Sequence, residues 1–111
     1  MARVDEYKKH IQSLIQEYAS LSSSDREIEV ETIIDTERHH YQVVNVGWVN
    51  NRRVYGCVLH IDLKNGKVWI QYNGTEMQVA EELVKLGIPK DDIVLAFHSP
   101  YKRQFTGFAV S

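Results

Sequence analysis

Two titratable side chains stand two residues apart near the middle of the chain, at His60 and Asp62. In an extended strand such residues project from one face, with backbones roughly 7 Å apart. An imidazole and a carboxylate at that spacing can share a small ligand or move a proton. No nucleophile or third polar group is predicted beside them. A small-ligand sensor or hydrolase centred on His60, Asp62 and His98 is therefore the third of three functional hypotheses.

A second group of possible metal ligands contains His39 and His40, which follow Asp35 and Glu37. Neighbouring residues of an extended chain project in opposite directions, so these two imidazoles are not expected to chelate one ion together. A solvated turn explains this run better. The single cysteine, Cys57, cannot make a typical zinc site or an internal disulfide. We expect neither a metal nor a cofactor.

The sequence contains none of the familiar catalytic motifs. It has no glycine-rich phosphate loop, serine elbow, HExxH helix or CxxC pair. Its carboxylates are scattered, and the pair Asp91-Asp92 precedes an apolar run, a position typical of a turn. We therefore expect that the protein is not an enzyme and has no catalytic residue.

Some basic residues are candidates for contact with the phosphates of nucleic acid. They are Arg38, Arg52, Arg53, Lys102 and Arg103. Proteins that bind nucleic acid alone usually have a basic surplus, whereas this chain has a formal net charge of −2 and a pI of about 6.2. Ordinary solvated charge is the simpler explanation, and an accessory DNA-binding factor is the second hypothesis.

Length and composition are those of one globular domain, residues 1–111. Of these 111 residues, 43% are hydrophobic and 25% are charged, which is typical of soluble globular chains. No apolar run has the length of a signal peptide or a membrane span, so we expect a cytoplasmic protein without membrane contact. A chain of this size has little stability to spare, which favours a homo-oligomer that covers leftover apolar surface.

The hydrophobic pattern changes from a helical to a strand period along the chain. Apolar residues at three- and four-residue steps predict an amphipathic helix from about Arg3 to Ala19, and the polar run 22–25 is expected to end it. Two-residue alternation then predicts strands at Ile28–Ile34, Tyr41–Trp48, Arg53–Lys64 and Lys67–Tyr72.

The last third of the sequence predicts a second helix and two short extended segments. Thr75 and Gln78 have the spacing of a capping box at the start of this helix, and Gly87 suits its left-handed end. Ile93–Phe97 is expected to be an apolar strand, and Phe105–Val110 a final extended piece.

Two tight turns, at Asn50-Asn51 and Asn65-Gly66, predict the register of the strands. The cross-strand pairs that follow share one apolar face. They are Leu63 with Val68, Ile61 with Ile70, Leu59 with Tyr72, Val46 with Tyr55, and Val44 with Cys57. We therefore predict an α+β fold: an antiparallel β-meander sheet with an N-terminal helix and a second helix packed on one face.

The opposite face of this predicted sheet mixes aromatic residues with a few polar groups, a composition typical of binding surfaces. Its predicted members are Tyr41, Val43, Val58, His60, Asp62, Trp69 and Gln71. Passive packing, including packing in a homo-oligomer, is the simplest interpretation. Recognition of a different partner comes next, and catalysis last.

Five ordered stretches of the chain match one known family. They are DTERHHYQVVNVGW (Asp35–Trp48), RRVYGCVLHIDLKNGKVWIQ (Arg52–Gln71), GTE (Gly74–Glu76), GIPKDDIVLAFHSP (Gly87–Pro100) and TGFAV (Thr106–Val110). The chain thus resembles the XisI-like family, the fdxN-element excision controlling factors of cyanobacteria. His39 stands where the family often has Asp, and Tyr55 where it often has His, so neither residue is assigned chemistry.

The resemblance implies an accessory role in the programmed excision of a DNA element during heterocyst differentiation. Such factors act beside a recombinase and a companion factor, XisH, and do not cleave the strands themselves. The leading hypothesis is therefore a non-enzymatic controlling factor that makes protein–protein contacts with an XisH-like companion. Any involvement of DNA would then be indirect.

Overall fold

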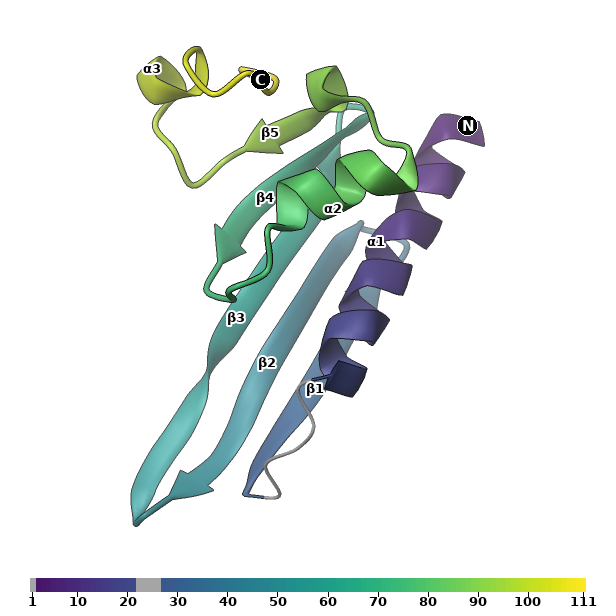
Figure 1. Cartoon of the computed structure of the whole chain (residues 1–111). Helices are drawn as coiled ribbons and strands as arrows, with labels where there is room; N and C mark the ends of the chain where they lie inside the picture. The colour runs from purple at the N-terminus through teal and green to yellow at the C-terminus, as the bar shows by residue number, and fades with distance from the viewer. Residues whose placement is uncertain (1, 22–26) are drawn as a thin grey trace.

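A five-stranded sheet with strand order β1-β2-β3-β4-β5 forms the frame of the protein, in a computed structural model that describes residues 2–21 and 27–111 (Figure 1). The elements are α1 (Ala2–Leu21), β1 (Ile28–Asp35), β2 (His40–Val49), β3 (Arg52–Lys64), β4 (Lys67–Asn73), α2 (Val79–Leu86), the 3-10 helix η1 (Lys90–Asp92), β5 (Ile93–Leu95) and α3 (Pro100–Arg103). The first four strands pair antiparallel, and β5 joins β4 in parallel. The predicted α+β class is confirmed.

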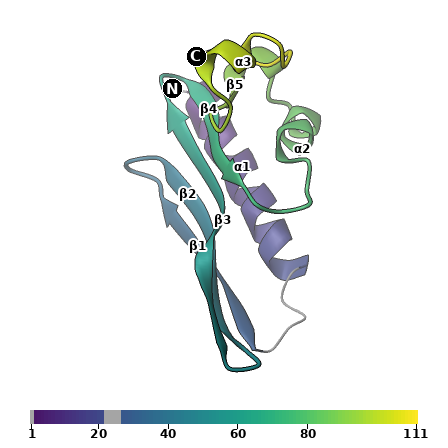
Figure 2. The ribbon, with the colours of Figure 1, turned by 90° about the vertical axis from the view of Figure 1, so that its left-hand side faces the viewer.

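Helices α1 and α2 lie on one side of the sheet, and the core fills the space between them and the strands (Figure 2). From α1 the apolar stripe supplies Tyr7, Ile11, Leu14 and Ile15, all buried. The sheet and the following elements contribute Tyr41, Val43, Leu59, Ile61, Val68, Ile70, Leu83, Ile88 and Ile93. None of the helices in the described ranges is long and apolar enough to cross a membrane.

The N-terminal helix is held against the other end of the chain by a polar contact. The hydroxyl of Tyr7 donates a hydrogen bond to a carboxylate oxygen of Asp92, and Arg3 lies 3.7 Å from the same oxygen. Burial, followed by the bond to Asp92, raises the pKa of Tyr7 to about 12. The helix ends at Leu21, two residues later than expected. The predicted stop at residues 22–25 lies outside the described residues.

The second helix begins later than its predicted capping box. Thr75 closes a turn with Asn73, whose side-chain oxygen accepts a hydrogen bond from the Thr75 amide at 2.9 Å, and α2 starts only at Val79. The capping-box prediction is therefore wrong. The C-terminal prediction is confirmed, because Gly87 is left-handed (φ 116°) and the amide of Ile88 bonds to the carbonyl of Leu83.

The C-terminal segment is not the extended piece predicted for Phe105–Val110. It contains α3 and turns, and only Ala109 forms a single bridge to Val94. Arg103 explains why the segment folds back. Its guanidinium donates hydrogen bonds to the carbonyls of His98 (3.0 Å) and Ala96 (3.2 Å), which compete with a strand ladder.

Both predicted turns form, but β3 carries one residue too many for the predicted register between them. Val44 pairs with Cys57 as expected, whereas Val43 pairs with Leu59, so that Val58 is extra on β3. Such a β-bulge turns the side chains beyond it to the other face of the sheet. The apolar pairs near Asn50-Asn51 and those near Asn65-Gly66 therefore lie on opposite faces, contrary to the prediction.

A second irregularity lies between β3 and β4. Ile61 pairs with Ile70 and Leu63 with Val68, as predicted, but Leu59 pairs with Asn73 rather than with Tyr72. His60 takes Tyr72 as its partner. Together the two irregularities decide which side chains of the middle strands reach the core.

Candidate functional site

The face of the sheet opposite α1 and α2 is termed the open face. Four of its predicted members lie there: His60, Asp62, Trp69 and Gln71. The other three belong to the core side, which corrects the prediction. Tyr41 and Val43 are fully buried in the core, and Val58 packs against it. The cause is the bulge at Val58, which moves Tyr41 and Val43 opposite Ile61 and Leu59.

The same shift brings His40 to the open face, directly across from Asp62. Its Nδ1 lies 2.8 Å from Asp62 Oδ1, and His60 Nε2 lies 2.9 Å from the same oxygen. The amide of Gln71 donates to the other oxygen, Oδ2, at 3.3 Å. We call His40, His60, Asp62 and Gln71 the polar cluster. It comes from two paired strands and the neighbouring β4, so the backbone ladder fixes its geometry.

The neighbouring side chains of the polar cluster differ in their exposure to solvent, from half-exposed to nearly buried. The side chain of His40 is 52% exposed, that of His60 29%, and that of Asp62 15%. The carboxylate therefore sits beneath the two imidazoles and is satisfied by three side-chain partners. This arrangement can bind a cation or pair with a protonated imidazole, and no hydroxyl or thiol nucleophile hydrogen-bonds to it within the described residues.

Sequence reasoning missed His40 because it was assigned to a turn. An isolated glycine inside a strand pattern can indicate a bulge, and Gly56 stands two residues before Val58. That signal would have moved His40 to the open face. His98, the third member of the hypothesised catalytic group, lies after β5 with its ring 4.6 Å from that of Phe97. The described residues show no hydrogen bond between His98 and the polar cluster.

The turn predicted around His39 is present, and it uses its polar side chains locally. Asp35 Oδ1 accepts the amide hydrogens of Arg38 (2.9 Å) and Glu37 (3.0 Å). The bond from Arg38 is the largest cause of the lowered pKa of Asp35. His39 is left-handed (φ 61°), and its Nδ1 lies 3.1 Å from the hydroxyl of Tyr41. His39 and His40 thus have different partners, as their adjacency predicts.

The second notable region of the open face lies at the free end of the β2–β3 hairpin. There the guanidinium of Arg53 lies 5.4 Å from the ring centre of Trp48 and 6.0 Å from that of Tyr55. Trp48 is 56% exposed and Tyr55 72% exposed. We call Trp48, Arg53 and Tyr55 the aromatic patch. Sequence reasoning assigned Tyr55 to the core face, and the bulge at Val58 again explains the difference.

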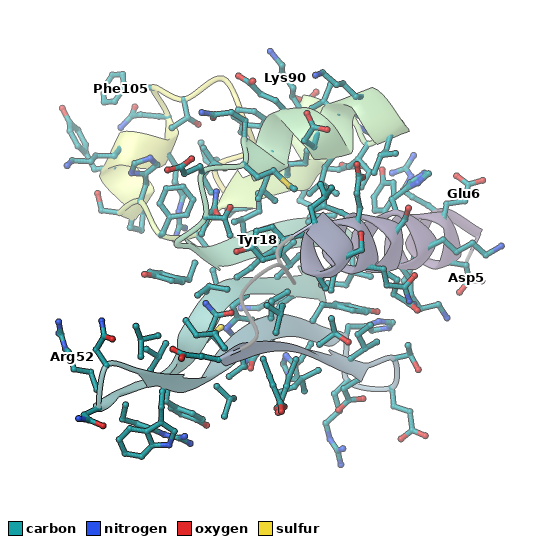
Figure 3. All side chains as sticks on the ribbon, turned by 60° about the horizontal axis from the view of Figure 1, so that its bottom comes forward. Asp5, Glu6, Tyr18, Arg52, Lys90 and Phe105 are labelled. Carbon is teal, nitrogen blue, oxygen red and sulfur yellow. The ribbon has the colours of Figure 1, made fainter. Side chains whose placement is uncertain are left out.

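The basic residues do not form one surface. Arg38 follows β1, whereas Arg52 and Arg53 begin β3 at the other end of β2, about 30 Å away for ten extended residues. Figure 3 shows Arg52 at the hairpin tip, away from the C-terminal segment that carries Phe105. Lys102 and Arg103 belong to that segment, and Arg103 is already bonded to backbone carbonyls.

The pocket beside α2 does not include the hypothesised catalytic residues. Its volume is about 140 Å³, and it is lined by residues of β4, α2, β5 and the C-terminal segment, Phe108 among them. His60, Asp62 and His98 are not part of its lining.

Comparison with known proteins places the chain in a family. The family model described as XisI protein matches residues 1–110. The crystal structure of a XisI-like protein from Anabaena variabilis ATCC 29413 is 50% identical with a TM-score of 0.89, covering 95% of this chain and 96% of that one. The fdxN element excision controlling factor XisI from the same organism is 35% identical with a TM-score of 0.86, covering 98% and 99%. No curated protein matched. The chain belongs to the XisI family.

Proposed function

We propose that this protein is a non-enzymatic accessory factor in the controlled excision of a DNA element, and that it acts by binding an XisH-like companion protein through the aromatic patch. Membership of the XisI family supports the excision role, as does the similarity to a structure that carries the name of an excision controlling factor. The exposed patch supports the mode of action.

The observation that carries this proposal is the exposure of two large aromatic rings on one hairpin. Trp48 and Tyr55 flank Arg53 at the end of the sheet that none of the described helices covers (Figure 1). Burying apolar area contributes about 25 cal/mol per Å², and these rings leave much of theirs in water. Tryptophan, tyrosine and arginine are also the residue types that most often dominate the energy of protein interfaces.

Contacts within the patch restrict the rotamers of its side chains. Arg53 is held over both rings, and its guanidinium donates a hydrogen bond to the carbonyl of Gly47 at 3.5 Å. A partner would therefore have few rotamers left to freeze at this surface, which reduces the entropic cost of association.

Trp69, another aromatic residue of the open face, is less available to a partner than the sequence suggests. Lys64 Nζ lies 4.7 Å from the centre of its ring, and the guanidinium of Arg103 lies 5.7 Å from it. Its indole N–H donates to the carbonyl of Lys64 at 3.1 Å. Trp69 thus contacts Arg103 of the C-terminal segment, and Trp48 replaces it as the residue expected to contact the partner.

The test is a binding titration between the untagged chain and an XisH-like protein from the same source. We expect Trp48→Ala and Tyr55→Ala each to weaken binding at least tenfold, which corresponds to about 1.4 kcal/mol. Both variants should remain folded because the rings are exposed. Tyr101→Ala is the matched control, since this tyrosine is 70% exposed but lies on α3, and it should leave binding unchanged.

A second copy of the chain is the alternative occupant of the patch, and sedimentation of the protein alone separates the two cases. We infer that the chain also forms a homo-oligomer, through a surface other than the aromatic patch. If Trp48→Ala dissociates a dimer and leaves companion binding intact, the patch is a self-association surface and the proposal fails. Salt-dependent retention on DNA that Arg52→Ala and Arg53→Ala abolish, without any companion binding, would also overturn it.

A further inference from the structure

Three side chains with metal-binding atoms converge on the open face, away from the aromatic patch. The ligand atoms offered by His40, His60 and Asp62 all lie within 4.8 Å of one another. Two of the three separations are 2.8 Å and 2.9 Å, each measured to Asp62 Oδ1. The ligand atoms of a tetrahedral Zn²⁺, each about 2.0–2.2 Å from the ion, lie only slightly farther apart than these two separations to Asp62. Small side-chain rotations therefore suffice to admit an ion.

We propose that His40, His60 and Asp62 bind a divalent transition-metal ion of the Zn²⁺ type. Two imidazoles and one carboxylate suit such an ion, whereas Mg²⁺ and Ca²⁺ prefer oxygen ligands alone. Three protein ligands leave one coordination position for water or for an atom of another molecule. The half-exposed ring of His40 places that position at the solvent side of the cluster.

The surroundings of the three residues support a built site rather than a chance meeting of side chains. His40 and Asp62 are directly paired across β2 and β3, and His60 is two residues from Asp62 on the same strand. The Gln71 amide bonds to Asp62 Oδ2 and so directs Oδ1 toward both imidazoles. Outer contacts of this kind orient metal ligands and raise their affinity. Asp62 is also largely buried, which strengthens its attraction for a cation.

Nearby groups that could compete for the ion are engaged elsewhere. His39 contacts the hydroxyl of Tyr41, and Asp35 accepts backbone amides within its turn. Cys57 is paired with Val44, on the other side of the bulge from the polar cluster. Removing His40, His60 or Asp62 should therefore weaken binding of the ion, whereas removing the neighbouring His39 should not.

The experiment titrates the untagged, metal-free full chain first with Co²⁺, followed by visible absorption, and then with Zn²⁺ by calorimetry. We expect one ion per chain and the intense Co²⁺ bands of a site with fewer than six ligands. Loss of a group that only hydrogen-bonds to a metal ligand typically weakens binding 10- to 100-fold, and we expect Gln71→Ala to fall within that range. His60→Ala and His40→Gln should each weaken Zn²⁺ binding by more than this. His39→Asn is the matched control, because asparagine keeps the left-handed backbone and removes the adjacent imidazole.

Each outcome decides for or against the site. A weak Co²⁺ spectrum like that of the hydrated ion, measured on the unaltered protein, overturns the proposal whatever the variants do. So does a loss of affinity in His39→Asn as large as that in His40→Gln. Thermal unfolding checks that the variants fold, and Zn²⁺ should raise the unfolding temperature of the unaltered chain and of His39→Asn but not of His60→Ala.

Discussion

His40, His60 and Asp62 of the polar cluster lie on the same two strands and the same face as the aromatic patch, but the two regions differ in what is packed behind them. Behind His40, His60 and Asp62 are the buried residues Tyr41 and Ile61, covered in turn by α1. The patch lies on the part of the β2–β3 hairpin that extends beyond both helices (Figure 1). A firm backing preserves ångström-scale geometry, which an ion needs, whereas a projecting hairpin offers area, which a protein partner needs.

The bulge at Val58 separates these two regions, and inserting one alanine between Val43 and Val44, opposite Val58, would abolish the distinction. With the two strands then matched residue for residue, either Tyr41 and Val43 leave the core, or Trp48 and Tyr55 turn to the helix side. Exposing one fully buried valine alone costs about 1.5–3 kcal/mol, and the tyrosine adds to this. We expect the insertion to remove most of the free energy of unfolding, measured by urea denaturation.

Val58→Ala is the control for that insertion, because it alters the bulge but keeps the number of residues and hence the register. It should cost about 1–2 kcal/mol, the loss expected for two partly buried methyl groups. Equal stability of the insertion variant and Val58→Ala would mean that the bulge does not hold the two regions in place.

The sequence predicts the register of the strands correctly beside the turns and wrongly far from them. The pairs beside Asn65-Gly66 and Asn50-Asn51 are correct, because left-handed residues dictate tight reversals. The error arises midway between the turns, at Val58, where each register is locally consistent and only core packing selects between them. His60, Asp62, Trp69 and Gln71 were therefore assigned to the right face. Tyr41, Val43 and Val58 were not, and His40 was missed.

The C-terminal third was less predictable for a related reason. The apolar run at Ile93–Leu95 predicts a strand but not its direction, which is parallel because α2 crosses from β4 to β5. Residues 105–110 are rich in apolar side chains, yet the hydrogen bonds of Arg103 to the carbonyls of residues five and seven positions earlier outweigh that preference for a strand. Bonds of this kind from a side chain to the backbone leave no signature in the hydrophobic pattern.

Two glycines that lie close together on β2 and β3 give a sharper test of how the hairpin is anchored to β1. A Cβ atom on Gly47 would lie 2.1 Å from the carbonyl oxygen of Glu27, which is backbone and cannot move aside. A Cβ on Gly56 would meet nothing within 4 Å. We expect Gly47→Ala to lower the free energy of unfolding by about 1–3 kcal/mol, as overpacking does.

Gly56→Ala should leave stability unchanged or raise it slightly, since alanine restricts the unfolded chain. Urea denaturation of both variants measures the difference. If Gly56→Ala is the more harmful of the two, the tight approach of β1 to Gly47 is not what fixes the start of the hairpin.

The smallest expected effect on stability concerns α1, which lies behind the polar cluster and is held in part by the hydrogen bond from Tyr7 to Asp92. Tyr7→Phe removes this neutral donor and should cost about 1 kcal/mol near pH 8. Because folding raises the pKa of Tyr7 from 10.0 to about 12, its contribution is complete below pH 10 and is lost as the pH rises from 10 to 12. The stability gap between the unaltered protein and Tyr7→Phe should therefore narrow over that window, as measured by urea unfolding at each pH. A gap that stays constant from pH 8 to pH 12 would show that the phenol of Tyr7 ionises as readily in the folded protein as in the unfolded chain.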